Sequence, residues 1–164
     1  MRQINNRATA ALAVAGCAVA VGAAAVPASA DAATLKFFQK STGSQFLGPD
    51  GQPLSNPMMI TPGSTFSATD LNYVGTHKRH ASTATASDHI ACTLTTDTTG
   101  ICNGQIAIGG FMLLANAVTV NFASSNITVA INGGTGKYAH ARGTATSVGI
   151  GNTNNSDFTV RYRT

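Results

Sequence analysis

Asp70 is the residue in this sequence whose type and surroundings most directly suggest chemistry. Phe66, Ala68 and Asp70 alternate along a β-forming run, so their side chains share one face of a strand. An apolar environment raises the pKa of a carboxyl group, which can then serve as a general acid or base. In the other interpretation, Asp70 lies at a strand end and caps the turn after Asn72. The sequence leaves both interpretations open.

Three tyrosines and one arginine are further candidates. Tyr73, Tyr138 and Tyr162 could line an interior cavity with their hydroxyl groups, although such residues are more often core residues with a bonded hydroxyl. Arg142 could bind an anionic group or could hold nearby backbone carbonyls, and His140 is expected in a solvated turn. No serine has the surroundings of a catalytic nucleophile. The candidate catalytic residue is therefore Asp70, and the candidate substrate-binding residues are Phe66, Tyr73, Tyr138, Arg142 and Tyr162.

The elements that would position these residues read as almost entirely β. Short β-rich runs cover residues 35–40, 65–73, 89–95, 101–108, 111–122, 126–131, 144–150 and 157–163, with a less regular run over 77–86. A proline-rich loop is expected from Gly43 to Gly63. Runs of this length and spacing predict an antiparallel sandwich or barrel, and eight or nine strands suit a closed barrel.

A Gly-rich segment, Ile131–Thr144, joins two of these runs. Glycines at this density allow positive φ and sharp turns, so we expect a tight crossover with one helical turn around residues 138–140. A phosphate loop would need glycine and a hydroxyl residue where Ile131 and Tyr138 stand. A dinucleotide fingerprint would need a long helix, which Gly143 and the β-branched residues after it prevent.

Cys92 and Cys102 flank a turn-rich segment. A strand, turn and strand would place the two sulfur atoms on facing strands of a hairpin, and in an exported chain a disulfide is expected. Two free thiols are the alternative. No metal site is expected, because the odd spacing of His89 and Cys92 points their side chains to opposite faces of a strand.

Residues 1–30 have the features of a secretory signal peptide. Arg2 and Arg7 precede an uncharged Ala-rich run, and residues 28–30 (Ala-Ser-Ala) form a small-residue cleavage site. As a permanent membrane span the run is weakly hydrophobic, and a lipid anchor on Cys17 would more usually be followed by polar residues. We expect a secreted protein with one domain, residues 31–164. Without the two signal arginines the formal net charge falls from +4 to +2, which gives no argument for nucleic acid binding.

The segment Asn132–Gly143 closely resembles the Gly-rich signature of the allene oxide cyclase/dirigent superfamily, and looks most like its secreted bacterial members. His140 stands where glycine would be expected. The resemblance continues through residues 66–71, 92–95 and 102–104, and covers about residues 64–162. It implies an all-β fold, an antiparallel eight-stranded calycin-like barrel, and places Asp70 where these families carry an acidic strand residue.

The resemblance also implies a class of function. Its members act on apolar, unsaturated small molecules, either as cyclases or as dirigent proteins that guide stereochemistry, and the work is mainly to hold a reactive substrate in one shape. The alternatives are a non-catalytic binder and a structural protein whose barrel is filled by its own side chains. The allene oxide cyclase reaction would use a glutamate, and residues 31–164 contain none. The expected partner is an apolar small molecule, with no cofactor, no nucleic acid and no stable membrane insertion after cleavage; a homo-oligomer is left open.

Overall fold

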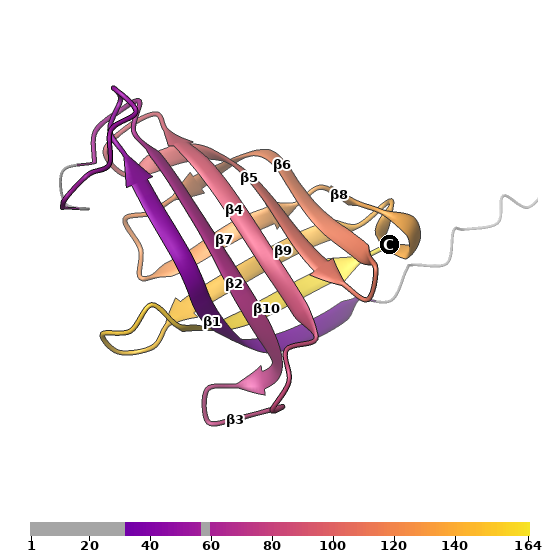
Figure 1. Cartoon of the computed structure of the whole chain (residues 1–164). Coiled ribbons are helices and arrows are strands. Elements are labelled where there is room, and N and C mark those ends of the chain that lie inside the picture. The colour runs from indigo at the N-terminus through magenta and orange to yellow at the C-terminus, as the bar shows by residue number, and fades with distance from the viewer. Residues whose placement is uncertain (1–31, 57–59) are drawn as a thin grey trace, which may run out of the picture.

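The computed structural model describes residues 32–56 and 60–164. The proposed signal peptide lies outside this range. The described chain is nearly all strand (Figure 1), with one 3-10 turn, η2 (Gly136–Tyr138). The strands are β1 (Ala33–Leu47), β2 (Thr65–Thr76), β3 (Arg79–His80), β4 (Ala86–Leu94), β5 (Thr99–Ile108), β6 (Phe111–Asn121), β7 (Asn126–Ile131), β8 (Gly133–Gly134), β9 (Arg142–Gly149) and β10 (Ser156–Arg163).

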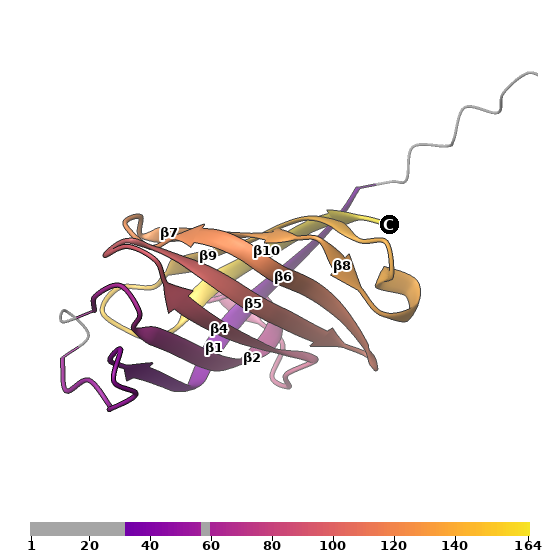
Figure 2. The same ribbon diagram turned by 90° about the horizontal axis from the view of Figure 1, so that it is seen from above.

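Nine strands follow one antiparallel path in the order β7-β9-β10-β1-β2-β4-β5-β6-β8, and β3 pairs with the end of β2. β7 and β8 are consecutive pieces of one extended segment. β7 pairs with β9 at one end of the path, and β8 pairs with Leu113 and Leu114 of β6 at the other. The sheet therefore curls into a nearly closed barrel, with β7, β9 and β10 facing β2 and β4 (Figure 2). The expected all-β barrel is confirmed.

The side chain of Asn132 completes the seam between β7 and β6. Its Nδ2 donates to the carbonyl oxygen of Asn116 at 2.8 Å, and its Oδ1 accepts from the amide of Asn116 at 2.9 Å. The Asn132 backbone amide also donates to the carbonyl oxygen of Leu114 at 3.0 Å. One side-chain amide thus supplies a donor and an acceptor where the two strands do not pair directly.

The barrel interior divides into a filled end and a less filled end. At the filled end, the residues of the Gly-rich crossover pack inward, with Tyr138 and Ala141 buried against Phe37, Leu113 and other core residues. A second cluster surrounds Cys92, Cys102 and Val120. Interior packing of one end leaves any ligand space toward the other.

Two expectations from the sequence were wrong in detail. The predicted loop from Gly43 begins too early, because β1 continues to Leu47 after a bulge between Ser41 and Gly43. The extra residue shifts the inward-facing positions of β1 from odd to even numbers. The alternation of inward and outward side chains therefore continues along the strand, although the sequence pattern is interrupted. The run over residues 77–86 is interrupted more than expected, because only β3 and Ala86, the first residue of β4, are strand.

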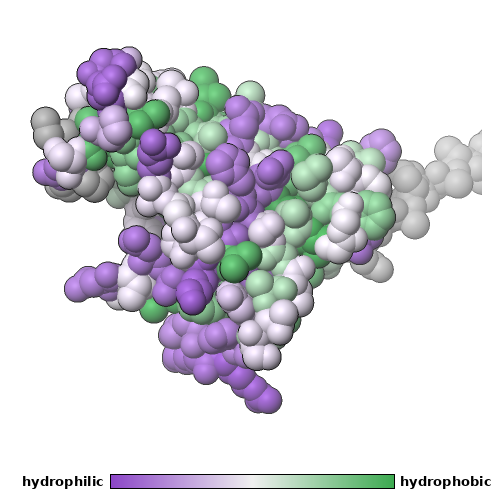
Figure 3. All heavy atoms as spheres, in the orientation of Figure 1, coloured by the Kyte–Doolittle hydropathy of each residue, from purple (hydrophilic) through white to green (hydrophobic). Residues whose placement is uncertain are grey.

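The β2–β3 hairpin projects from the barrel and carries hydrophilic residues (Figure 3). His77 holds its base: its backbone amide and its Nδ1 each lie 2.7 Å from a carboxylate oxygen of Asp157 on β10. Within the described residues, no helix is long and apolar enough to cross a membrane.

Candidate functional site

The interior contains a cavity of about 430 Å³. Strands from all sides of the barrel contribute its walls, because alternate residues of each strand face inward. Its lining includes apolar residues of β2, β4, β6, β7 and β10 and polar residues of β1, β2, β4, β9 and β10. Such a volume suits one small molecule.

One wall of the cavity is apolar. Phe66, Ile90, Phe122, Ile127 and Val129 line it. All five pack against the cluster around the cysteines, yet each is only partly buried. Inward-facing side chains that keep exposed surface are those that border open space, so this wall has apolar area that a ligand could cover.

A second part of the lining, here called the polar wall, carries a hydrogen-bond network centred on Gln39 of β1. Its Nε2 donates to Oδ2 of Asp88 at 2.9 Å, and its Oε1 accepts from the hydroxyls of Ser147 and Ser156. Ser147 Oγ also lies 2.7 Å from Ser156 Oγ. Asn72 Nδ2 donates to the same Asp88 oxygen at 2.6 Å. The carboxylate of Asp88 is therefore fixed by two side-chain amides.

Asp70 and Asp88 are direct partners across β2 and β4. Both line the cavity, and only 8% and 9% of their surfaces are exposed. Burial first, and then the neighbouring charge of Asp88, raise the pKa of Asp70 to about 7. Burial also raises the pKa of Asp88, while hydrogen bonds from Asn72, Gln39 and Asp70 oppose that rise. Both shifts favour the protonated forms, so the two carboxyls hold protons to a higher pH than isolated aspartates do.

Asn72 lies next to this pair and is fully buried. Its Nδ2 bonds to Asp88, but its Oδ1 has no hydrogen-bond donor among the described residues. A buried acceptor without a donor is costly. The network therefore has an excess of acceptors at the position of the two carboxyls.

The cavity opens where β1 leaves β10. β1 pairs with β10 only from Ala33 to Gln39, whereas its pairing with β2 runs on to Leu47. Beyond Gln39, the β9–β10 loop faces β1, and Asn155 Oδ1 accepts from the amide of Ser41 at 3.2 Å. Exposed residues line this mouth: Ser44, Ser125, Thr153 and Asn154.

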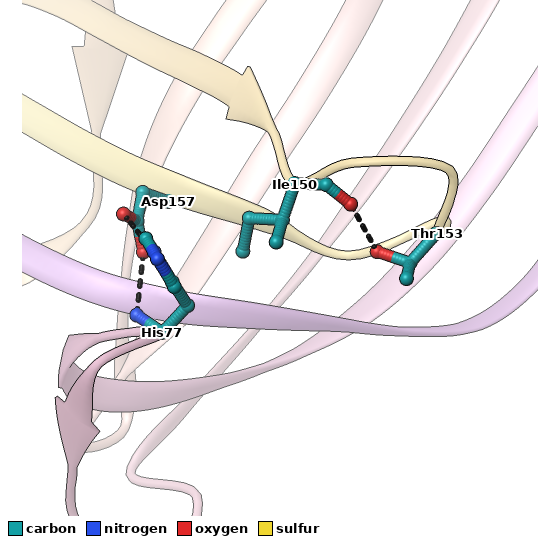
Figure 4. Close-up of polar contacts among 4 residues, drawn as sticks. All are labelled: His77, Ile150, Thr153 and Asp157. Carbon is teal, nitrogen blue, oxygen red and sulfur yellow. Dashed lines mark hydrogen bonds and ion pairs between the residues drawn. The ribbon is translucent and has the colours of Figure 1, made fainter.

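The β9–β10 loop at the mouth is held by its own contacts. Thr153 Oγ1 donates to the carbonyl oxygen of Ile150 at 2.7 Å (Figure 4). The backbone amide of Ile150 donates to the carbonyl oxygen of Asn155 at 3.0 Å. These bonds shape the mouth independently of β1.

The structure brings together only some of the candidate residues. Asp70 and Phe66 line the cavity. Tyr138 is buried at the filled end, with its ring 5.4 Å from that of Tyr162 at right angles, and neither residue lines the cavity. Tyr73 occupies an odd position of β2 and packs on the outer face against Phe38 and His80.

Arg142 holds the crossover and does not reach the cavity. Its Nη1 donates to the carbonyl oxygen of Ala141 at 2.8 Å. The predicted disulfide between Cys92 and Cys102 is confirmed; the two residues are paired directly across β4 and β5.

Sequence reasoning missed Asp88, Gln39, Ser147 and Ser156. The predicted strand began at His89, which left Asp88 in a turn. Starting that strand three residues earlier would have placed Asp88 on one face with Ile90 and Cys92, the same pattern that singled out Asp70. Gln39 and the two serines carry no local signal, because their partners lie on strands remote in sequence.

Solved structures show similar barrels. A pyocyanin demethylase matches with a TM-score of 0.60 and 20% identity, over 79% of this chain and 99% of that one. A pterocarpan synthase dirigent protein matches with a TM-score of 0.55 and 16% identity, over 82% and 84%. A nonspecific heme-binding cyclase that catalyzes a [4 + 2] cycloaddition matches with a TM-score of 0.56 and 9% identity, over 82% of this chain and 68% of that one. No protein-family model and no curated protein matches the sequence. The structural matches confirm the barrel fold expected from the allene oxide cyclase/dirigent resemblance.

Proposed function

We propose that this protein binds an apolar small molecule in its barrel and promotes an isomerisation, cyclisation or stereochemically guided coupling of it. The observation that carries the proposal is the Asp70–Asp88 pair, which lines a cavity of about 430 Å³ that also has an apolar wall. The apolar wall would hold the substrate in one conformation, and the pair would move a proton.

The roles of the two carboxyls follow from their surroundings. Asp70 has a pKa of about 7, which suits a residue that both donates and accepts a proton at neutral pH. The carboxylate of Asp88 is held by Gln39 and Asn72, so it stays in place while Asp70 changes charge. General acid–base catalysis of this type contributes roughly 10²–10⁴ in rate.

The alternative is a binder or structural protein without turnover. The cavity counts against a barrel wholly filled by its own side chains, because several inward-facing apolar residues remain partly exposed. Proteins of the same fold include a demethylase, a dirigent protein and a cyclase, by their names. This supports small-molecule chemistry but names no substrate for this chain.

We also propose that the protein is secreted with cleavage after Ala30. The signal-like residues 1–30 and the Cys92–Cys102 disulfide support export to an oxidising compartment. N-terminal sequencing of protein from the culture medium should begin at Asp31. A first residue of acylated Cys17 would contradict this cleavage.

Native mass spectrometry of protein from its own culture medium would test the proposed function, since a retained ligand would provide an assay. With that ligand, Asp70→Asn should lower turnover about 100-fold or more. Asp97→Asn is the matched control, because Asp97 is exposed in the β4–β5 turn and the same charge is lost. Unchanged turnover in both Asp70→Asn and Asp88→Asn would show that the pair moves no proton in the reaction, and a retained ligand that the wild-type protein does not turn over would leave only the binding function.

A further inference from the structure

The charged side chains that line the cavity are mainly acidic. The titratable residues among its lining are Asp70, Asp88 and His89, and no lysine or arginine of the described chain lines it. His89 is exposed, and its Nδ1 lies 3.3 Å from the hydroxyl of exposed Thr69, because its odd position on β4 turns the ring outward. The side chains that face the space inside are therefore neutral or acidic.

The hydrogen bonds of the polar wall use up its donors and leave acceptors available to a ligand. Gln39 Nε2 and Asn72 Nδ2 both donate to Asp88, and the hydroxyls of Ser147 and Ser156 donate within the network. Apart from the proton of Asp70, these donors point at acceptors of the network itself. A ligand that meets this wall must bring donors.

We propose that the ligand of this cavity is an organic cation, an apolar ring or chain body that carries a protonated amine. The ammonium would lie against Asp70 and Asp88, and the body would cover the wall formed by Phe66, Ile90, Phe122, Ile127 and Val129. This inference rests on the proposed function, because it names the ligand class of the same cavity.

An ammonium group matches both the acceptors and the negative charge of the polar wall. It supplies up to three donors to a site rich in acceptors, and its charge balances carboxylates that burial otherwise penalises. A carboxylate or phosphate ligand would instead meet like charge without a basic partner, which is costly in a dry site.

Binding should also depend on pH. Asp70 lies opposite Ser41 of β1 and Asp88 of β4, Gln39 and Asn72 contact Asp88, and the charge of His89 acts on Asp88 from the same strand. An ammonium stabilises the ionised form of Asp70, so binding below about pH 7 displaces a proton. Cation affinity should therefore rise as pH increases through 7.

Isothermal titration of the whole secreted chain with three matched probes tests the inference. The probes are 1-naphthylmethylamine, 1-naphthylmethanol and 1-naphthoate, which share one ring body and differ in charge. At pH 8 the amine should bind at least 10-fold more tightly than the alcohol, and the naphthoate most weakly. The preference for the amine should shrink at pH 5.5.

Two variants and one control variant locate the effect. Asp70→Asn should cost the amine about 10-fold in affinity and leave the alcohol unchanged, whereas Asp97→Asn should change neither. Ala68→Phe, which fills cavity space, should weaken both probes. If Asp70→Asn fails to fold, the comparison of the three probes at the two pH values on the wild-type protein still tests the preference for a cation.

The outcomes separate this inference from the proposed function. Alcohol binding as tight as amine binding, or tighter naphthoate binding, would overturn the cation assignment and leave the cavity as a ligand site. A wild-type protein that binds none of the three at millimolar concentration would contradict both.

Discussion

Asp70 on β2 and Asp88 on β4 stand directly opposite each other, and both side chains point into the barrel. Directly opposed residues in an antiparallel pair have side chains within contact distance. Two like charges there are unfavourable, so the pair retains one proton to a higher pH than either acid would alone. The stability and chemistry of the barrel are therefore linked through one proton.

The first prediction concerns stability against pH. The pKa of Asp70 is about 7 in the folded protein and 3.8 in its ordinary state. Between these values the folded state keeps a proton that the unfolded chain has lost. Stability should thus fall as pH rises through this window, by up to about 1.4 kcal/mol per pH unit. Urea unfolding at half-unit pH steps measures the slope.

Asp70→Asn should flatten that slope, because the amide does not titrate. Asp97→Asn should keep it. Equal slopes for the wild type and Asp70→Asn would contradict the raised pKa of Asp70.

The second prediction concerns Gln39, whose amide holds Asp88. Gln39→Met keeps the approximate volume but removes the donor, so the pKa of Asp88 should rise further. Leaving a buried acceptor without its donor should cost about 1–3 kcal/mol. Carboxyl-carbon NMR titration of ¹³C-aspartate protein measures the first effect. Lys40→Met, on the next and exposed position of β1, is the control.

The third prediction concerns the glycines of the crossover. A Cβ at Gly134 would collide with the carbonyl oxygen of Tyr138 and lie 2.6 Å from that of Met112, and a Cβ at Gly136, where φ is +53°, would collide with the Phe111 ring. Gly134→Ala and Gly136→Ala should each lower the melting temperature markedly. Gly133→Ala is the matched control, because its nearest neighbour would be 3.8 Å away. Equal melting temperatures for all three variants would contradict the close packing.

The fourth prediction concerns the disulfide. Cys92→Ala with Cys102→Ala should lower stability by about 3 kcal/mol, since the unfolded chain loses a closed loop. Thermal melting of the oxidised wild type, the reduced wild type and the double variant measures the loss. Peptide mapping without reductant should recover the linked pair, and two alkylatable thiols in native protein would refute the bond.

The fifth prediction concerns Ala117, whose φ is +49° at the bulge of β6. Asn103 Oδ1 accepts from its backbone amide at 2.9 Å and fixes this conformation. A left-handed conformation costs a residue with a Cβ about 1–2 kcal/mol, so Ala117→Gly should be neutral or slightly stabilising. Ala115→Gly on the same strand should destabilise, because Ala115 is buried. Destabilisation by Ala117→Gly equal to that by Ala115→Gly would refute the strain.

Local patterns in the sequence were enough to predict a barrel and to place Asp70 on the same strand face as Phe66 and Ala68. Alternation along β2 placed Phe66, Ala68 and Asp70 on one face, and the facing cysteines of a hairpin were visible from the turn between them. Both inferences depend only on the period of a strand and the chemistry of a turn.

The rest depended on contacts between strands remote in sequence. Gln39 and Ser156 are separated by 117 residues, and nothing in either neighbourhood predicts that they bond. The bulge after Ser41 also reversed the inward face of β1, so strict alternation would have turned Phe46 outward. Tyr73 was a candidate for the cavity, but its odd position on β2 places its ring on the outer face of the barrel, where it packs against Phe38.

The parting of β1 from β10 after Gln39 has a kinetic consequence. A ligand that passes beside Ser44 and Asn154 crosses side chains and a loop, and no ladder of strand hydrogen bonds has to break for it to leave. Its residence time is then set by the contacts it makes inside, and not by the rate at which the barrel unfolds. Tight binders should dissociate slowly, weak binders quickly, and both should do so with the same undisturbed amide exchange in β2 and β4.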